Sequence, residues 1–297
     1  MNKKKFVGLR GLRYRTKESL KPTNMTKGEI SKFFVKYLPI MKTGRKKRVP
    51  MWRIVKAILY KLKTGTQWSH LPIREIFGSI KYSWQSVFYH FNKWSQCGIW
   101  DKCYDELIKE NRRKLDLSVV NLDGSHTPAK RGGEQVGYQG RKKSKTTNML
   151  ILTDRQGVPI GYTPPISGQH HDAFDLVNFC NKIFDKMEQN KLRCSGLFLN
   201  ADAGFDVQKF RELCDEREIS HNIDINKRNK KQEDQTDGYL FDNELYKKRF
   251  SVEQLNAWVD GFKTLRIRYE TKACNWMAFH CLAFSIIFLR KFNSINI

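Results

Sequence analysis

Acidic residues are scarce in this chain of 297 residues: 30 Asp and Glu stand against 55 Lys and Arg, which gives a net charge of +25. A positive surplus of this size attracts polyanions, so nucleic acid is the first partner to expect and a membrane surface is the weaker alternative. Apolar residues are not scarce, since they make up 40% of the chain. A folded core is therefore expected.

Long hydrophobic runs are missing as well. The most apolar stretch, 276–289, is interrupted by His280 and is shorter than the roughly 20 residues that a membrane-spanning helix needs. No apolar segment follows the basic N-terminus, as a signal peptide would require. The seven cysteines form neither a C-x-x-C pair nor a zinc-type spacing with histidine. These absences predict a protein of a reducing cytoplasm, without a membrane partner.

The first part of the chain is predicted to be helical. Residues 1–25 are basic and short of large apolar side chains, as in a flexible arm, and residues 26–116 show helical spacing of apolar residues throughout. A short helix after Pro72 and a longer one capped by Ser83 are joined by a turn containing Gly78. This is typical of a helix-turn-helix DNA-binding unit, although any helical bundle contains such pairs. The side chains predicted to read DNA are Gln85, Tyr89, Asn92 and Lys93.

After Asp116 the pattern changes to apolar runs of strand length. Five strands are predicted, at 117–122, 147–153, 158–163, 196–200 and 219–225. The first three should form an antiparallel meander around a glycine-rich basic loop at 130–145. Helices are predicted after the third strand (capped by Asp172), after the fourth strand, and at 274–292. This element order is that of a ribonuclease-H-like α/β fold, so we predict a catalytic domain at 117–297 with a mixed five-stranded sheet.

The segment 246–270 is predicted to be one helix of this domain, capped by Asp242 or Asn243. Its apolar face would carry Leu255, Trp258, Val259, Phe262 and Leu265. Tyr246, Arg249 and Glu253 fall together on the opposite face. A solvated face with an ion pair between Arg249 and Glu253 would explain this grouping without any further role.

Three carboxylates are placed where the predicted sheet would bring them together. Asp123 and Asp202 follow buried strands, at the edge where α/β sheets commonly place their sites, and Glu253 lies on a helix packed on the same sheet. Three convergent carboxylates suit Mg²⁺ or Mn²⁺, and two such ions can assist an in-line displacement at phosphorus. Each acid also has a structural explanation, because Asp123 precedes a turn-type glycine and Asp202 could cap a helix.

Several stretches resemble the bacterial insertion-sequence transposases of the DDE class, most of all the insertion-sequence-5 family. These stretches are GTQWSHLP (65–72), LDGSH (122–126), the basic glycine-rich run 137–161, SGQHHD (167–172), ADAGFD (201–206) and 246–270. The family signature Tyr-x-x-Arg-x-x-x-Glu corresponds to Tyr246, Arg249 and Glu253. One departure is Asp260, seven residues after the glutamate, where the family often has lysine.

The resemblance implies a metal-binding catalytic triad of Asp123, Asp202 and Glu253, with two Mg²⁺ or Mn²⁺ ions per site. Residues expected to contact DNA are Tyr246, Arg249, His126, Arg141, Lys142, Lys143 and Lys145. The implied activity is cut-and-paste transposition: a homodimer binds terminal repeats in double-stranded DNA, cleaves them and joins them to target DNA. Its place would be the bacterial cytoplasm, at the nucleoid. The alternatives are a nuclease of the same fold and a non-catalytic DNA-binding protein derived from a transposase.

Overall fold

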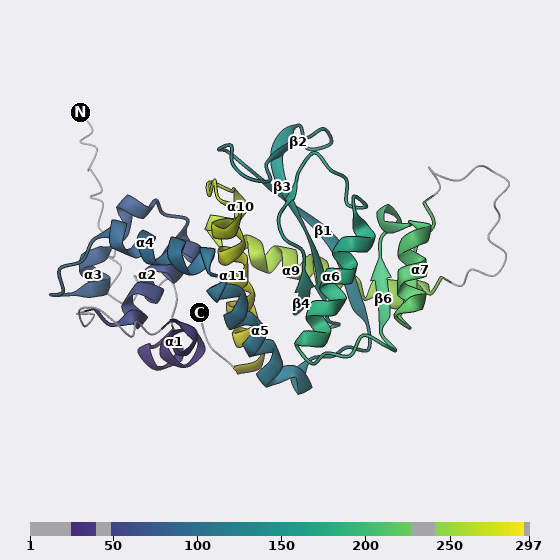
Figure 1. Cartoon of the computed structure of the whole chain (residues 1–297), viewed down its shortest axis with the longest axis horizontal. Helices are drawn as coiled ribbons and strands as arrows, with labels where there is room; N and C mark the ends of the chain where they lie inside the picture. The colour runs from purple at the N-terminus through teal and green to yellow at the C-terminus, as the bar shows by residue number, and fades with distance from the viewer. Residues whose placement is uncertain (1–24, 40–48, 227–240, 294–297) are drawn as a thin grey trace, which may run out of the picture.

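The computed structural model describes residues 25–39, 49–226 and 241–293. The predicted arm at 1–25, apart from its last residue, and most of the charged segment between the last strand and Asp242 lie outside these ranges. Figure 1 shows a group of helices at one end of the molecule, a curled sheet with its covering helices at the other, and the long C-terminal helix α11 between them.

The helical region follows the predicted boundaries closely. Thr26 caps α1 in a capping box with Glu29, and the Ser83 side chain accepts a hydrogen bond from the backbone N–H of Ser86 at the start of α4. The predicted pair of helices around Gly78 is therefore confirmed. The elements are α1 (Lys27–Phe33), η2 (Val35–Tyr37), α2 (Met51–Thr64), η3 (Trp68–His70), α3 (Ile73–Phe77), α4 (Trp84–Gln96), α5 (Ile99–Asn111) and η4 (Arg112–Lys114).

The sheet is mixed, as predicted, and among the described residues it has seven strands. They are β1 (Val120–Pro128), β2 (Gly137–Gln139), β3 (Ser144–Thr153), β4 (Pro159–Tyr162), β5 (Ile166–Ser167), β6 (Phe198–Ala201) and β7 (Ser220–Ile223). The path is β2-β3-β1-β6-β7, and β4 and β5 also pair with β3. The antiparallel meander of β1, β3 and β4 is confirmed, as is the parallel arrangement of β1, β6 and β7. The two strands not predicted, β2 and β5, are short additions beside β3.

The first strand was predicted to end just before Asp123, and this boundary is wrong. Its parallel pairing with β6 includes Val120 and Asn121, but its antiparallel pairing with β3 continues to Pro128. The strand persists because β3 goes on satisfying its backbone groups after β6 has ended. The basic loop predicted at 130–145 is correspondingly shorter, since β2 and the start of β3 form a hairpin within it.

The helices that follow the meander and precede α11 are α6 (Leu176–Gln189), η5 (Ala203–Phe205), α7 (Gln208–Glu216), α8 (Asn243–Lys247), α9 (Phe250–Asp260) and α10 (Lys263–Arg266). The single helix predicted over 246–270 is therefore wrong: it is three short helices, although Asp242 does cap the first. Phe262 is in an extended conformation between α9 and α10 and is buried, as is Leu265. Breaking the helix lets both side chains reach the core.

The start of helix α6 also differs from the prediction. The residue before α6 is Asp175, and its side chain makes no capping hydrogen bond. Asp172, the predicted cap, instead accepts a hydrogen bond from the Asn148 side chain at 2.8 Å. Asp172 therefore bonds to a side chain of β3 and not to the backbone at the start of α6. The local sequence pattern does not reveal this partner.

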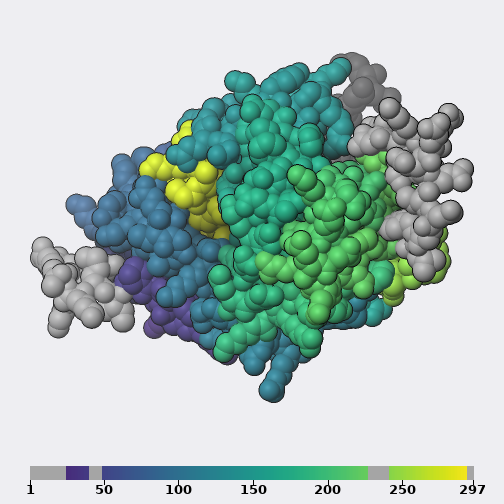
Figure 2. Space-filling view, turned by 45° about the vertical axis from the view of Figure 1, so that its right-hand side comes forward, coloured from purple at the N-terminus to yellow at the C-terminus, as the bar shows by residue number. Residues whose placement is uncertain are grey.

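The C-terminal helix α11 (Ala273–Asn293) packs against α4 and α5 on one side and α9 and α10 on the other. Its segment Ala273–Phe292 is long and apolar enough to cross a membrane, but 78% of the hydrophobic window is buried inside the molecule. The buried apolar residues of α11 belong to one hydrophobic cluster, which also includes Trp94 from the helical region and Leu150 from the sheet. In Figure 2 the C-terminal segment is visible between the helical region and the sheet. Helix α11 is thus a core helix shared by the two parts of the chain.

Candidate active site

Strand register brings the first two acids together. Asn121 of β1 is paired with Asn200 of the parallel strand β6. Asp123 and Asp202 each follow these partners by two residues, so their side chains leave the same face of neighbouring strands. Asp123 still lies within β1, whereas Asp202 has passed the end of β6 and its side chain accepts a hydrogen bond from the backbone N–H of Gly204 at 2.8 Å. Asp202 thus caps the short 3-10 helix η5, whereas the helix it was expected to cap, α7, begins without a side-chain cap.

The third acid is brought to the same place by Arg249, which lies between α8 and α9. The Arg249 guanidinium is 2.8 Å from Asp123 Oδ1, 3.8 Å from Asp202 Oδ2 and 3.9 Å from Glu253 Oε1. One cationic group thus lies within 4 Å of three carboxylates that are separated by up to 130 residues in sequence. The pairing of Arg249 with Glu253 that the helix alone suggested is present, and it is the longest of the three contacts.

The three acids differ in their access to solvent. The side chain of Asp123 is 20% exposed, that of Asp202 is 45% exposed and that of Glu253 is 60% exposed. Burial raises the pKa of Asp123; the positive charge of Arg249 opposes this shift and the negative charge of Asp202 adds to it. The Asn256 side chain also donates to Asp123 Oδ2 at 3.3 Å. Asp123 is therefore the anchored member of the group, and Glu253 is the most accessible.

A buried row of amide side chains, which was not predicted from the sequence, underlies the acids. Asn222 of β7 donates to Asn200 of β6 at 2.9 Å, and Asn200 donates to Asn121 of β1 at 3.0 Å. Asn121 in turn donates to Ser251 of α9 at 2.9 Å, and Asn200 also donates to the backbone oxygen of Leu245 in α8. This asparagine row joins three parallel strands to the two helices that flank Arg249.

The sequence did contain a sign of this row. The pattern Asn-x-Asp occurs where the parallel pairing of each of these strands ends, as 121–123, 200–202 and 222–224. The three asparagines are in register, and each is followed two residues later by an aspartate. Burial raises the pKa of Tyr246; the positive charge of Arg249 opposes this shift, and the negative charges of Asp202 and of the exposed Asp224 add to it.

His126 lies further along β1, with its side chain only 3% exposed. Its ring nitrogens are 3.4 Å from Asp172 Oδ1 and 3.1 Å from Thr146 Oγ1. A side chain added at the intervening Gly124 would meet Asp172, which explains why a glycine stands beside Asp123. Contact between His126 and DNA remains a prediction, and it would require the ring to leave these partners.

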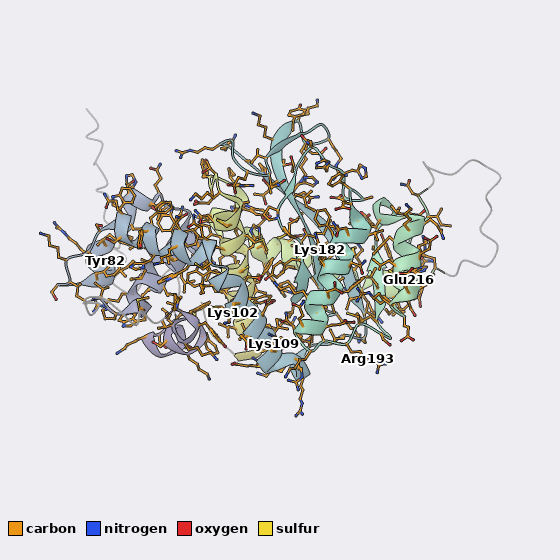
Figure 3. All side chains as sticks on the ribbon, viewed as in Figure 1. Tyr82, Lys102, Lys109, Lys182, Arg193 and Glu216 are labelled. Carbon is orange, nitrogen blue, oxygen red and sulfur yellow. The ribbon has the colours of Figure 1, made fainter. Side chains whose placement is uncertain are left out.

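The predicted basic contacts are exposed and cluster at the hairpin of β2 and β3. Arg141, Lys142 and Lys143 form its turn, Lys145 follows in β3, and Lys142 also donates to the backbone oxygen of His126 at 3.3 Å. Positive charge is not confined to this hairpin. Figure 3 shows Lys102 and Lys109 of α5 on the opposite side of the view. The net charge therefore does not by itself locate a DNA-binding face.

The side chains predicted to read DNA from α4 are not equally available. Gln85, Tyr89 and Lys93 are exposed. Asn92 is partly buried, and its Oδ1 accepts from Lys272 at 3.3 Å and from Asn275 at 3.2 Å. Asn92 thus joins α4 to the start of α11, beside a cavity of about 720 Å³ that Trp68, Phe88 and Tyr269 also line.

The chemistry of the three acids fits a divalent ion, but their present spacing does not. Carboxylate oxygens are the ligands that Mg²⁺ and Mn²⁺ prefer. Within the described ranges, however, no three His, Cys, Asp or Glu side chains are close enough to hold a metal together. The space between the acids is taken by the Arg249 guanidinium. If these three acids hold a metal, Arg249 would have to move away and the carboxylates would have to approach one another.

A ribonuclease-H-like sheet with acids on two adjacent strands and on a following helix defines a class of protein, and comparison with known families identifies it. Residues 114–288 match the family model described as "Transposase DDE domain", and residues 32–104 match "Putative transposase of IS4/5 family". The first match spans more than half of the chain. The chain belongs to the DDE transposase family, and the predicted resemblance to insertion-sequence transposases is confirmed.

Individual relatives are more distant. A curated relative from Burkholderia cepacia, "Insertion element IS402 uncharacterized 16.2 kDa protein", is 30% identical over 82 residues, which are 27% of this chain and 53% of the relative. The chain thus spans about half the length of this relative. Among solved structures, a piggyBac transposase synaptic complex with hairpin DNA is 10% identical, with a TM-score of 0.46 over 95% of this chain and 75% of the other.

A Mos1 mariner paired-end complex with Mn is 11% identical, with a TM-score of 0.28 over 87% of this chain and 82% of the other. Both TM-scores are below 0.5, so neither structure bears on what this chain does.

Proposed function

We propose that this protein is a cut-and-paste DNA transposase, which binds the terminal repeats of its own element, cleaves them and joins the freed ends to target DNA. The observation that carries the proposal is the meeting of Asp123, Asp202 and Glu253 around one guanidinium, in a chain of the DDE transposase family. Two of these acids are positioned by strand register and the third by a helix.

In this proposal Asp123, Asp202 and Glu253 bind two divalent ions, Mg²⁺ or Mn²⁺. The bound ions supply the activation of the attacking hydroxyl and the stabilisation of the leaving oxygen during in-line displacement at phosphorus. The protein's own residues position these ligands. Asn256 and the backbone of β1 fix Asp123, and the asparagine row fixes the segments that carry Arg249 and Glu253.

DNA is held by Tyr246 and by several cationic side chains. Arg249 and Tyr246 flank the acids from the α8–α9 segment, and the basic hairpin supplies Arg141, Lys142, Lys143 and Lys145. Each phosphate that these residues neutralise releases counterions, which strengthens binding at low salt. Gln85, Tyr89 and Lys93 on α4 read the terminal repeats in the major groove. The domain boundary proposed near residue 116 separates this helical reading unit from the catalytic part.

Transposition requires two element ends to be held together, so we propose a homodimer in the synaptic complex. The proposed location is the bacterial cytoplasm at the nucleoid, where the DNA substrate lies. The buried position of α11 supports this, because a helix that completes the core is not available to a membrane.

The experiment that tests the proposal uses duplex DNA carrying the sequences that flank the gene, incubated with the full chain, Mg²⁺ and a supercoiled target. Transposition predicts cleavage at the repeat boundary, a free 3′-hydroxyl and a joined product. Cleavage without joining would support the nuclease instead. Binding without either product, in Mg²⁺ and in Mn²⁺, would support the non-catalytic DNA-binding protein.

A further inference from the structure

We propose that Arg249 occupies the metal position in the DNA-free protein and is transferred to a DNA phosphate when substrate binds, so that DNA and metal bind cooperatively. This inference rests on the proposed function, because it takes the three acids as metal ligands. It adds that the metal site is closed until DNA arrives. Arg249 is thus a positioning residue with two sets of partners.

The first support is the location of the guanidinium. A metal bound by the three carboxylates must lie between them, and that is where Arg249 lies, at 2.8, 3.8 and 3.9 Å from their oxygens. Mg²⁺ binds carboxylate oxygen at about 2.1 Å. A divalent ion on Asp123 Oδ1 would therefore be in close contact with a guanidinium nitrogen that bonds the same oxygen, and the two cations would repel each other.

The second support is charge balance. Three carboxylates carry three negative charges, and Arg249 compensates one of them. Without a cation between them, the acids would repel one another at this spacing. A guanidinium that bridges all three keeps Asp123, Asp202 and Glu253 close in the absence of metal. Arg249 therefore holds the site assembled and also keeps metal out.

The third support is an unused donor. The Nε of Arg249 is buried and has no hydrogen-bond partner among the described residues, although the side chain itself is 15% exposed. Arginine binds phosphate best through two parallel N–H donors. Once the side chain leaves this buried position, Nε and a terminal nitrogen together fit a DNA phosphate, a paired contact that the carboxylates do not make here. Phosphate is thus the better partner, and moving to it frees the metal position.

The test measures metal binding rather than catalysis. Free Mn²⁺ is followed by its electron paramagnetic resonance signal while the full chain is titrated, with and without a short duplex of random sequence, and binding of Mn²⁺ to the duplex alone is subtracted. The variants are Arg249→Gln, Arg249→Lys, Asp123→Asn and the charge-matched control Lys247→Gln. Lys247 is 71% exposed and pairs only with Glu244 among the described acids.

Without DNA, Arg249→Gln should bind Mn²⁺ about tenfold tighter than the wild type, a typical size for coupled sites. Arg249→Lys should shift in the same direction, since one ammonium cannot bridge three acids. The duplex should tighten Mn²⁺ binding to the wild type and to Lys247→Gln by a similar factor, and leave Arg249→Gln nearly unchanged. Equal Mn²⁺ affinity of the wild type and both Arg249 variants would overturn the inference, as would a DNA effect that survives in them.

The Asp123→Asn variant distinguishes a failure of the Arg249 exchange from a failure of the proposed function. If Asp123→Asn binds Mn²⁺ as well as the wild type, the acids are not the metal site and the proposed function loses its basis. If Asp123→Asn weakens Mn²⁺ binding while the Arg249 variants behave as wild type, the acids are the metal site and only the exchange by Arg249 is wrong.

Discussion

Asn200 is the central member of the asparagine row, with hydrogen bonds to Asn121, Asn222 and the backbone oxygen of Leu245. It is fully buried. Asn200→Leu would remove three buried hydrogen bonds, each worth about 0.5–1.5 kcal/mol, and would leave Asn121 Oδ1 without its partner, which costs about 1–3 kcal/mol more. We expect the free energy of unfolding to fall by about 3 kcal/mol or more, measured by urea denaturation.

The matched control is Asn178→Leu. Asn178 is exposed on α6, and its hydrogen bond to Asp175 faces solvent. This substitution should change the free energy of unfolding by no more than about 0.5 kcal/mol. If both variants lost stability equally, the asparagine row would not be the cause of the effect.

At the scale of residues, the meeting of the three acids and the pairing of Arg249 with Glu253 could be predicted, but hydrogen-bond partners on neighbouring strands could not. Asp123 and Asp202 follow apolar runs, and this local feature is visible in sequence. The partner of Asp172 is Asn148, which only the folded sheet brings near. The three asparagines look like ordinary polar residues within their own strands. Their hydrogen bonds to one another can be recognised only when the register of the three strands is known.

The last residue of α9 is Asp260, an exposed acid at a helix C-terminus, where a negative charge is unfavourable. No cationic side chain lies within 4 Å of its carboxylate in the part of the chain that the structure describes. It lines a cavity of about 340 Å³ together with Lys142 and Asn256, and Asn256 contacts Asp123. The C-terminal end of α9 therefore lines a cavity next to the candidate site.

We expect Asp260→Lys to tighten DNA binding and to steepen the slope of log K against log salt by about 0.9, as one added phosphate contact would. Titrations of the wild type and the variant against duplex DNA at several salt concentrations measure this slope. An unchanged slope would mean that residue 260 does not face DNA.

Helix α11 contains a histidine whose protonation opposes folding. Burial lowers the pKa of His280 to about 4, from an ordinary value of 6.5. Between these values the unfolded chain binds a proton that the native protein does not, so stability falls as pH decreases from 6.5 toward 4. The loss should approach about 3 kcal/mol.

His280→Leu should flatten this dependence, as measured by urea unfolding at neutral pH and near pH 4.5. His171→Leu, which removes an exposed histidine, should leave the slope as in the wild type. A slope in His280→Leu identical to that of the wild type would contradict the assignment to His280.

At the scale of elements, helices and strands with strong periodicity were predictable and their ends were not. The helix 51–62, the last helix and all five main strands were found where the pattern indicated. Strand β1 runs past its predicted end because β3 supports it, and the predicted helix at 246–270 is broken so that Phe262 can be buried. Both outcomes depend on tertiary partners that a local pattern does not contain.

At the scale of the whole molecule, the helical region and the sheet share one buried cluster through α11. Lys186 of α6 also pairs with Asp101 and Asp105 of α5, at 2.5 and 3.3 Å. The change of periodicity near residue 116 was visible in sequence, but the return of the C-terminus to cover the N-terminal helices was not. Contacts between segments so far apart leave no local pattern.

The central claim is that three acids from separate segments form one metal site that cleaves DNA. The most direct measurement compares Mg²⁺-dependent cleavage of element-end DNA by the wild type with that of Asp123→Asn, Asp202→Asn and Glu253→Gln, alongside DNA affinity measured without metal. Each amide keeps the shape of the side chain and removes a charged ligand, so we expect cleavage to be abolished and DNA affinity retained. Near-wild-type cleavage by any one of the three variants would contradict the claim for that residue.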